Sequence, residues 1–301
     1  MTINLSALST EEQNSRTRNI DTVSTLQMVQ IINEEDQKVA LAIQPELPRI
    51  AAAIDVIAAK MKDGGRLVYQ GCGTSGRLGI LDAVECPPTY STDPADVVGI
   101  MAGGYEAMFK AKEGAEDDAS LGAEDLKQIG FGQKDVLVGI AASGRTPYVL
   151  GGMAYARQMG ATVIGISCTV GSSVAQLADI PITLLPGPEV VTGSTRMKSG
   201  TAQKMVLNML STGAMIRQGK VYRNLMVDVK PSNQKLVQRC KRIVCQAADV
   251  DEETATRTLE ACGYRAKTAI VMLKASVSVS EAEALLASHD GRIAAAIGEG
   301  N

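Results

Sequence analysis

The chain has 301 residues, enough for one large domain and one small domain, and its 45% apolar and 21% charged residues are typical of a folded globular protein. A net charge of −3 and only 3% aromatic residues argue against nucleic-acid binding, which usually needs a basic surface and stacking side chains. No apolar run reaches the roughly 18 residues of a membrane span, and the polar N-terminus lacks a signal core, so we expect a cytoplasmic protein.

Cysteine and histidine usage limits the chemistry. The six cysteines include no C-x-x-C pair, so they predict neither a zinc site nor a disulfide framework. The single histidine, His289, lies in a polar, alanine-rich stretch and is predicted to be a surface residue. Proton transfer in the main domain must therefore use carboxylates, lysine, tyrosine or cysteine.

Two helical stretches precede the first predicted strand. Residues 21–38 predict a helix with Ser24 as N-cap, because a serine side chain can accept hydrogen bonds from the first N–H groups. Residues 39–62 predict further helix, with a break at Pro45 and Pro48. We expect these helices to precede a sheet.

A glycine-rich loop follows the first predicted strand. Residues 67–69 predict that strand, and the loop GCGTSGRLG spans residues 71–79. The first N–H groups of the following helix lack intrahelical acceptors and carry partial positive charge, so the loop predicts an anion site. Three of its side chains can donate hydrogen bonds to a phosphate: Thr74, Ser75 and Arg77. We expect the helix to end near Val84, before Pro87 and Pro88.

The same loop also fits G-x-G-x-x-G, the motif of dinucleotide-binding folds. Such folds place an acidic residue at the end of the second strand, about 20 residues on, to hold a ribose. The next predicted strand, residues 97–101, ends instead in Ala102, Gly103 and Gly104. We therefore interpret the loop as a site for one terminal phosphate.

Helices and strands then alternate. The pattern predicts helices at residues 105–119, 123–129, 148–159 and 173–178, and strands at residues 135–141, 162–167 and 182–185. A loop of Ser143, Gly144, Arg145, Thr146 and Pro147 follows the third strand, as the glycine-rich loop follows the first. This alternation predicts an α/β fold with a doubly wound parallel sheet and ligands at the carboxyl ends of its strands.

A third polar loop, starting at residue 186, leads into a long helix. Apolar residues recur on this helix at helical spacing: Met205, Val206, Met209, Leu210 and Ala214. Such a stripe usually forms core or a subunit contact, and from it we expect a homodimer. From about residue 233 the pattern predicts only short helices, near residues 234–248, 252–261, 264–273 and 280–286. We therefore expect a main domain of residues 1–232 and a small helical bundle of residues 233–301.

Four sequence blocks together resemble one enzyme family. They are GTSGRLGILDAVECPPTY (73–90), AGGYEAMFKAKEGAEDD (102–118), VGIAASGRTPYV (138–149) and VVTGSTRMKSGTAQKMVLNMLSTG (190–213). In this order they resemble the bacterial N-acetylmuramic acid 6-phosphate etherases. The resemblance implies a flavodoxin-like sugar isomerase (SIS) domain and a small C-terminal helical domain. It also implies cleavage of the D-lactyl ether of N-acetylmuramate 6-phosphate by water, in amino sugar catabolism and peptidoglycan recycling, without a metal or cofactor.

The resemblance also implies roles for individual residues. The two catalytic glutamates of the family correspond to Glu85 and Glu116. The residues that bind the phosphosugar in this family correspond to positions in three loops: Thr74 and Ser75; Ser143, Gly144, Arg145 and Thr146; and Ser194 and Thr195. Glu113 lies three residues before Glu116 on the predicted helix and is the residue most easily confused with it.

Two other functions fit parts of the sequence. The glucokinase regulatory protein shares the GSTRMKSGTAQK block and binds its phosphosugar without cleaving it, but such regulators carry two SIS domains and this chain has room for one. An SIS-type aldose-ketose isomerase would use similar loops. Release of D-lactate from N-acetylmuramate 6-phosphate separates both alternatives from the etherase.

Overall fold

The computed structural model describes residues 9–110, 112, 114–229, 231 and 233–299. The chain forms two compact units. One contains the chain up to Val84 together with Ala95–Ser211, and the other contains Glu85–Pro94 together with the chain from Thr212. The expected boundary between residues 232 and 233 remains a prediction. No helix in the described part of the chain is both long and apolar enough to cross a membrane.

A five-stranded parallel sheet forms the centre of the first unit. Its strands are β1 (Leu67–Gly71), β2 (Val97–Met101), β3 (Val136–Ile140), β4 (Thr162–Ser167) and β5 (Ile180–Thr183). Their order is β2-β1-β3-β4-β5, and every pair is parallel. This is the flavodoxin-like order, so the predicted doubly wound α/β fold is confirmed.

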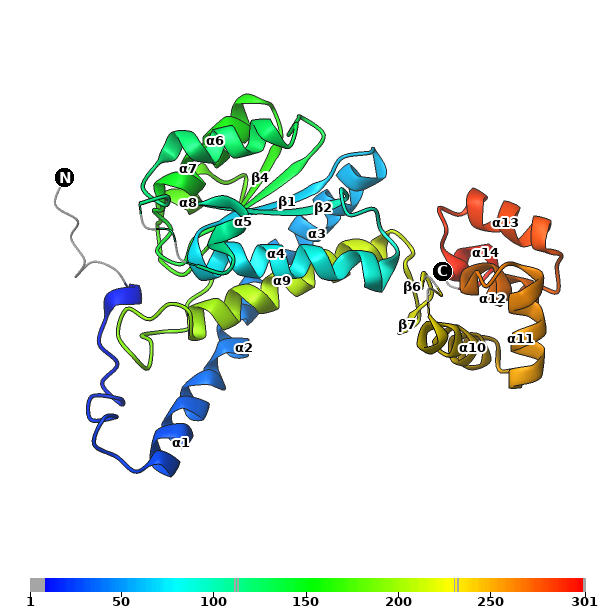
Figure 1. The fold of residues 1–301 in the computed structure, drawn as a ribbon, viewed down its shortest axis with the longest axis horizontal. Coiled ribbons are helices and arrows are strands. Elements are labelled where there is room, and N and C mark those ends of the chain that lie inside the picture. The colour runs from blue at the N-terminus through cyan, green and yellow to red at the C-terminus, as the bar shows by residue number, and fades with distance from the viewer. Residues whose placement is uncertain (1–8, 111, 113, 230, 232, 300–301) are drawn as a thin grey trace. The chain divides into compact units, whose positions relative to one another are not determined.

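Helices cover both faces of the sheet (Figure 1). In the described residues up to 217 the helices of the chain are η2 (Ser9–Glu11), α1 (Thr25–Asp36), α2 (Lys38–Ile43), η3 (Gln44–Glu46), α3 (Leu47–Lys62), α4 (Gly73–Tyr90), α5 (Gly104–Ala107), α6 (Ala119–Gln128), α7 (Pro147–Gln158), α8 (Ser173–Leu177) and α9 (Lys198–Arg217), and the first of these, η2, α1 and α2, extend away from the sheet. Alternate residues of β1 face the two layers: Val68 packs in the α7 core, whereas Tyr69 contacts α4 at Gly79. Both faces of β1 are therefore buried, as expected for a central parallel strand.

A buried polar network joins α4, β1 and α9. The hydroxyl of Tyr69 donates to Asp82 at 2.8 Å, and the amide of Asn208 donates to the other carboxylate oxygen at 2.7 Å. Because Asp82 is buried, these two hydrogen bonds compensate for its desolvation. The network fixes α4 and α9 against the same strand.

The N-terminal helix starts as predicted. Ser24 is the N-cap of α1, and Gln27 completes a capping box by accepting a hydrogen bond from the N–H of Ser24. The predicted break at the prolines is also present, because η3 separates α2 from α3. The sequence placed these boundaries well because caps and prolines act locally.

The predicted end of the next helix is wrong. Instead of stopping near Val84, α4 continues to Tyr90 with Pro87 and Pro88 inside it. A proline removes one backbone hydrogen bond and disfavours the helix before it, so packing must offset this cost. The last turns are held by the buried side chain of Cys86 and by the hydroxyl of Tyr90, which lies 3.3 Å from that of Thr212.

The predicted helix at residues 105–119 is also wrong. Only α5 forms there, and Glu116 lies in a turn before α6. Gly114, in the middle of the predicted helix, has a positive φ, which is incompatible with a continuous right-handed helix. Glu113, the residue most easily confused with Glu116, lies outside the described residues.

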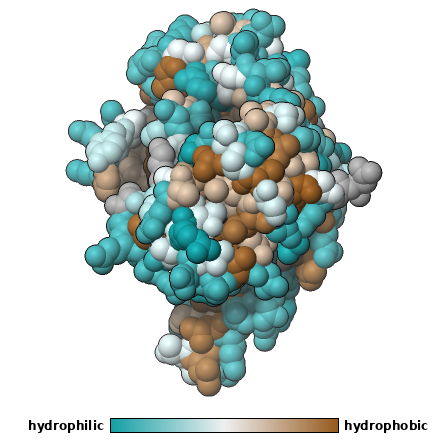
Figure 2. All heavy atoms as spheres, turned by 90° about the vertical axis from the view of Figure 1, so that its right-hand side faces the viewer, coloured by the Kyte–Doolittle hydropathy of each residue, from teal (hydrophilic) through white to brown (hydrophobic). Residues whose placement is uncertain are grey.

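The second unit consists mainly of short helices. They are α10 (Gln234–Ala248), α11 (Glu252–Ala261), α12 (Ala266–Ala275), α13 (Val279–Ser288) and α14 (Ile293–Ala296), and they follow a hairpin of β6 (Val221–Tyr222) and β7 (Leu225–Met226). Side-chain caps at Asn233, Asp251 and Ser278 start three of the helices, and their apolar faces share one core. Figure 2 views the molecule from the side of these helices and shows a mostly polar surface with scattered hydrophobic patches. The sequence predicted α10 and α11 to the residue but missed the hairpin and α14.

Candidate active site

The order of strands reverses between β1 and β3, which places a crevice at their carboxyl ends. Gly71 is in register with Ile140, so the loops that follow the two strands are neighbours. These are the glycine-rich loop and the loop of Ser143–Thr146. The structure thus brings together two of the three predicted phosphate loops.

The third loop reaches the same place through α9. A methyl group added at Gly200 would lie 3.3 Å from the Cγ2 atom of Thr74, so the first turns of α9 and α4 are in close contact. The N–H of Gly200 donates to the carbonyl of Thr195 at 2.9 Å. Ser75 donates to the amide oxygen of Gln203 at 2.8 Å. Thr195 is therefore held next to the start of the glycine-rich loop's helix.

The N-terminus of α9 is capped by the protein itself. The buried carboxylate of Glu189 accepts hydrogen bonds from the N–H groups of Lys198 and Ser199, both at 2.9 Å. It also accepts a bond from the hydroxyl of Ser199. Because these N–H groups are already satisfied, an incoming phosphate must use donors elsewhere in the site.

A buried ion pair ties the N-terminal helices to this loop. The ammonium of Lys198 lies 2.7 Å from Glu35 of α1, and both side chains are almost fully buried. Burial raises the pKa of Glu35, but hydrogen bonds from Lys198 and Lys38 outweigh it and lower the pKa to about 2. Lys198 also donates to the carbonyl of Pro186. Lys198 therefore makes structural contacts with both α1 and the segment that leads into α9.

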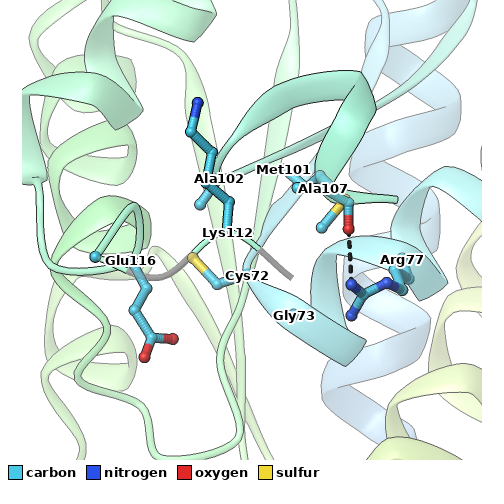
Figure 3. Close-up of a pocket in the computed structure, with 9 residues that line it drawn as sticks. Cys72, Gly73, Arg77, Met101, Ala102, Ala107, Lys112 and Glu116 are labelled. Atoms are coloured by element: carbon cyan, nitrogen blue, oxygen red, sulfur yellow. Dashed lines mark hydrogen bonds between the residues drawn. The ribbon is translucent and has the colours of Figure 1, made fainter. Parts of the chain in front are cut away.

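Figure 3 shows a cavity beside the glycine-rich loop. Its walls come from the start of α4, the end of β2 and the segment around α5: Cys72, Gly73, Arg77, Met101, Ala102, Ala107, Lys112, Gly114 and Glu116. Burial and the nearby charge of Glu116 raise the pKa of Cys72 to about 12. Cys72 therefore remains a neutral thiol, and among the described residues Glu116 contributes a carboxyl group to the cavity wall.

Glu116 is positioned by helix packing behind it. Its carbonyl accepts a hydrogen bond from the N–H of Tyr148, at the start of α7, at 3.1 Å. Two glycines allow α6 and α7 to pack closely there: a methyl group at Gly122 would lie 1.9 Å from the carbonyl oxygen of Tyr148, and one at Gly151 would lie 1.8 Å from that of Ala119. Glu116 is thus connected both to the cavity and to the helix that follows the Ser143–Thr146 loop.

Arg77 has partners within the protein. Its guanidinium donates to the carbonyl of Ala107 at 2.7 Å (Figure 3) and to that of Met108 at 3.0 Å. These bonds hold the segment after α5 against α4. The predicted role of Arg77 as a phosphate ligand remains a prediction, and in this structure two of its donors stabilise the cavity wall.

The other predicted ligands lie in loops that keep side chains available. Gly144 has a φ of +68°, and a methyl group there would lie 2.3 Å from Ser172, so the turn requires glycine. Ser143 and Thr146 flank the turn, are partly exposed and make no side-chain hydrogen bond to another described residue. Arg145, Ser194 and Thr195 are also partly exposed.

Glu85 does not line the cavity. It follows Val84 on α4 and is the first residue of the second compact unit. Its side chain is exposed. Leu81, one turn before Glu85 on α4, is 45% exposed, and Val84 is 58% exposed. The structure therefore places Glu116 beside the glycine-rich loop, and the catalytic role of Glu85 remains a prediction.

Sequence reasoning missed two residues of this region. Lys112 contributes to the cavity wall and points away from Glu116 (Figure 3). Gln203 contacts Ser75 from α9. Both lie inside sequence blocks that carry the family resemblance, but contacts between segments distant in sequence decide what each side chain touches. No group of three histidine, cysteine or acidic side chains suited to a metal ion occurs among the described residues.

Comparison with known proteins supports the fold. Residues 49–157 match the family of the glucokinase regulatory protein N-terminal SIS domain, and residues 130–213 match the SIS domain family. A solved phosphoheptose isomerase from Francisella tularensis superimposes with a TM-score of 0.50 at 15% identity, over 64% of this chain and 100% of that one. At this identity the likeness concerns the fold alone.

Full-length relatives are much more similar. An N-acetylmuramic acid 6-phosphate etherase from Klebsiella aerogenes is 57% identical over 99% of both chains. Another from Photobacterium profundum is 57% identical over 100% of both. Identity at this level along the whole length confirms the resemblance drawn from the four sequence blocks, and the chain belongs to the N-acetylmuramic acid 6-phosphate etherase family.

Proposed function

We propose that the protein cleaves the D-lactyl ether of N-acetylmuramic acid 6-phosphate with water, giving N-acetylglucosamine 6-phosphate and D-lactate. The observation that carries this proposal is the cavity in which a carboxylate, Glu116, shares the wall with Gly73 of the glycine-rich loop. A phosphate bound by that loop brings the rest of the sugar close to a proton-transferring group. The full-length etherase relatives support the same reaction.

The reaction needs one base and one acid. When the sugar ring opens, C1 becomes an aldehyde and the hydrogen at C2 becomes acidic. A base removes this proton, the electron pair forms a C2–C3 double bond, and the C3–O bond to lactate breaks as an acid protonates the departing oxygen. Water then adds to C3 and a proton returns to C2. Two carboxyl groups can perform both halves by exchanging roles.

We assign Glu116 as the base and Glu85 as the acid. Glu116 suits the base role because it faces the cavity at the phosphate loop. The phosphate itself would be held by N–H groups at the start of α4 and by hydroxyls from three loops, including Thr74, Ser143 and Thr195. These ligand roles rest on the family motifs and on the proximity of the loops.

We further propose a homodimer in which Glu85 of one subunit completes the site of the other. Two observations support it: the residues that line the cavity include Glu116 but not Glu85, and Leu81, one turn before Glu85, is exposed together with Val84. The apolar stripe of α9 supports it less than expected, because Val206, Leu210 and Ala214 are already buried within the chain. Exposed apolar residues beside a catalytic glutamate suit a symmetric interface.

Heterodimers test this arrangement. One subunit carrying Glu85→Gln and one carrying Glu116→Gln are co-expressed with different tags and purified as a mixed dimer. If each site combines glutamates from both subunits, one of the two sites is intact, and the heterodimer has about half of wild-type activity. An inactive heterodimer would show that both glutamates come from one chain.

Release of D-lactate tests the function itself. We expect turnover of N-acetylmuramic acid 6-phosphate and none of the unphosphorylated sugar, because the phosphate is the anchor. One alternative function is a regulator that binds a phosphosugar without cleaving it, because residues 49–157 match the SIS domain of the glucokinase regulatory protein. Tight binding of N-acetylglucosamine 6-phosphate without D-lactate release would favour that alternative.

A further inference from the structure

The buried side chain of Gln203 has no role in the proposed function, yet it touches the phosphate loop. It projects from α9, is 1% exposed, and accepts a hydrogen bond from Ser75 through its amide oxygen. Its amide nitrogen is buried and makes no hydrogen bond to another described residue. A buried unpaired donor is costly, so such groups usually have a reason to be retained.

The direction of this hydrogen bond matters for substrate binding. As the pair is arranged here, the hydroxyl proton of Ser75 points to Gln203 and is not available to a phosphate oxygen. Rotation of the amide by 180° would present its nitrogen as a donor to the Ser75 oxygen and release the hydroxyl proton. Because the nitrogen has no other partner among the described residues, this rotation breaks no other bond made by the nitrogen.

We infer that Gln203 is a positioning residue that orients the hydroxyl of Ser75 toward the phosphate when the substrate binds. This inference rests on the proposed phosphosugar site. In the free protein Gln203 accepts a hydrogen bond from Ser75, and in the substrate-bound protein it donates one to Ser75. A carboxylate cannot make this exchange, since when ionised it only accepts hydrogen bonds.

Three variants separate positioning from general stability. Gln203→Met keeps most of the volume but removes both hydrogen-bonding atoms. Gln203→Glu keeps the acceptor, removes the donor and adds a negative charge near the phosphate. Asn208→Ala is the control, because it removes another amide of α9 that bonds Asp82 rather than Ser75. Dissociation constants for N-acetylglucosamine 6-phosphate are measured by titration calorimetry, and folding is monitored by thermal denaturation.

We expect Gln203→Met to weaken binding about tenfold and Gln203→Glu to weaken it further, since hydrogen bonds to charged groups are the strong ones. Asn208→Ala should lower the melting temperature and leave the dissociation constant unchanged. In a Ser75→Ala background, Gln203→Met should cause no further loss, because both changes remove the same interaction. If Gln203→Met unfolds the protein, Gln203→Asn, which keeps the amide but shortens its reach, is tested in the same cycle.

Two results would overturn the inference. One is unchanged binding by Gln203→Met, and the other is additive losses in the double variant. Both readouts are equilibrium binding and require no turnover. A protein that binds the phosphosugar as described but releases no D-lactate would therefore refute the proposed function while leaving this inference intact.

Discussion

Because α6 packs closely on α7, we predict that Gly122→Ala displaces Glu116 and so lowers activity. The added methyl group would lie 1.9 Å from the carbonyl oxygen of Tyr148. Because contacts below about 3 Å are strongly repulsive, the two helices must separate by about 1 Å. The N–H of Tyr148 binds the carbonyl of Glu116, so this separation displaces Glu116 as well.

The magnitude follows from two opposing terms. Overpacking costs about 1 to 3 kcal/mol, whereas alanine gains up to about 1 kcal/mol over glycine in a helix. We therefore expect a net loss of about 1 to 2 kcal/mol in the free energy of unfolding, measured by urea denaturation. A displacement of about 1 Å at a catalytic group can lower kcat by about 10²-fold, measured as D-lactate release.

Gly132→Ala is the matched control. Its added methyl group has no atom within 4 Å, and Gly132 does not have a positive φ. This variant should keep wild-type stability and kcat. A Gly122→Ala protein with wild-type kcat would refute the idea that the α6–α7 contact positions Glu116.

Three further predictions concern stability, binding and metal dependence. The pKa of Glu35 is lowered from 4.5 to about 2 in the folded protein. The contribution of Glu35 to the free energy of unfolding is therefore complete above pH 4.5 and is lost as the pH falls toward 2. Urea denaturation across this pH range should show that the free energy of unfolding of the wild-type protein falls by roughly 3 kcal/mol. The Glu35→Gln variant should not show this pH-dependent fall. Ser143→Ala should raise the KM for the phosphorylated substrate about 10- to 100-fold by removing one donor to a charged group, and an unchanged KM would place the phosphate elsewhere. Activity should survive exhaustive chelation, and loss in EDTA with recovery on adding a divalent ion would contradict this.

Local signals in the sequence predicted much of the fold. The cap at Ser24 and the apolar runs of the five strands each depend on a few neighbouring residues, and all of them appear in the structure. Such features are readable because the physical cause lies within the segment itself. The glycine-rich segment does follow β1, but the predicted loop over residues 71–79 is wrong, because α4 already begins at Gly73.

The errors arise where distant contacts or glycine conformations decide the structure. The prolines at 87 and 88 signalled a helix end, but packing around Cys86 and Tyr90 keeps α4 intact. The acidic segment before α6 had the composition of a helix, but positive φ at Gly114 turns the chain. Sequence alone does not reveal which glycines will adopt that conformation.

The candidate site was predicted in part. The family motifs named Glu116, and the structure locates it in a cavity wall. Gln203 and the ion pair of Lys198 with Glu35 were not predicted, because each joins segments far apart in the chain. The homodimer, the cytoplasmic location and the catalytic role of Glu85 remain predictions.

Hydrogen exchange at C2 of the product tests the proposed mechanism most directly. N-acetylglucosamine 6-phosphate is incubated in heavy water with Glu85→Gln or Glu116→Gln protein, and deuterium at C2 is followed by NMR. A variant that lacks only the acid can still remove and return the C2 proton, so we predict exchange with Glu85→Gln and none with Glu116→Gln. The opposite pattern would exchange the two roles, and rapid exchange with both variants would show that neither glutamate is the base.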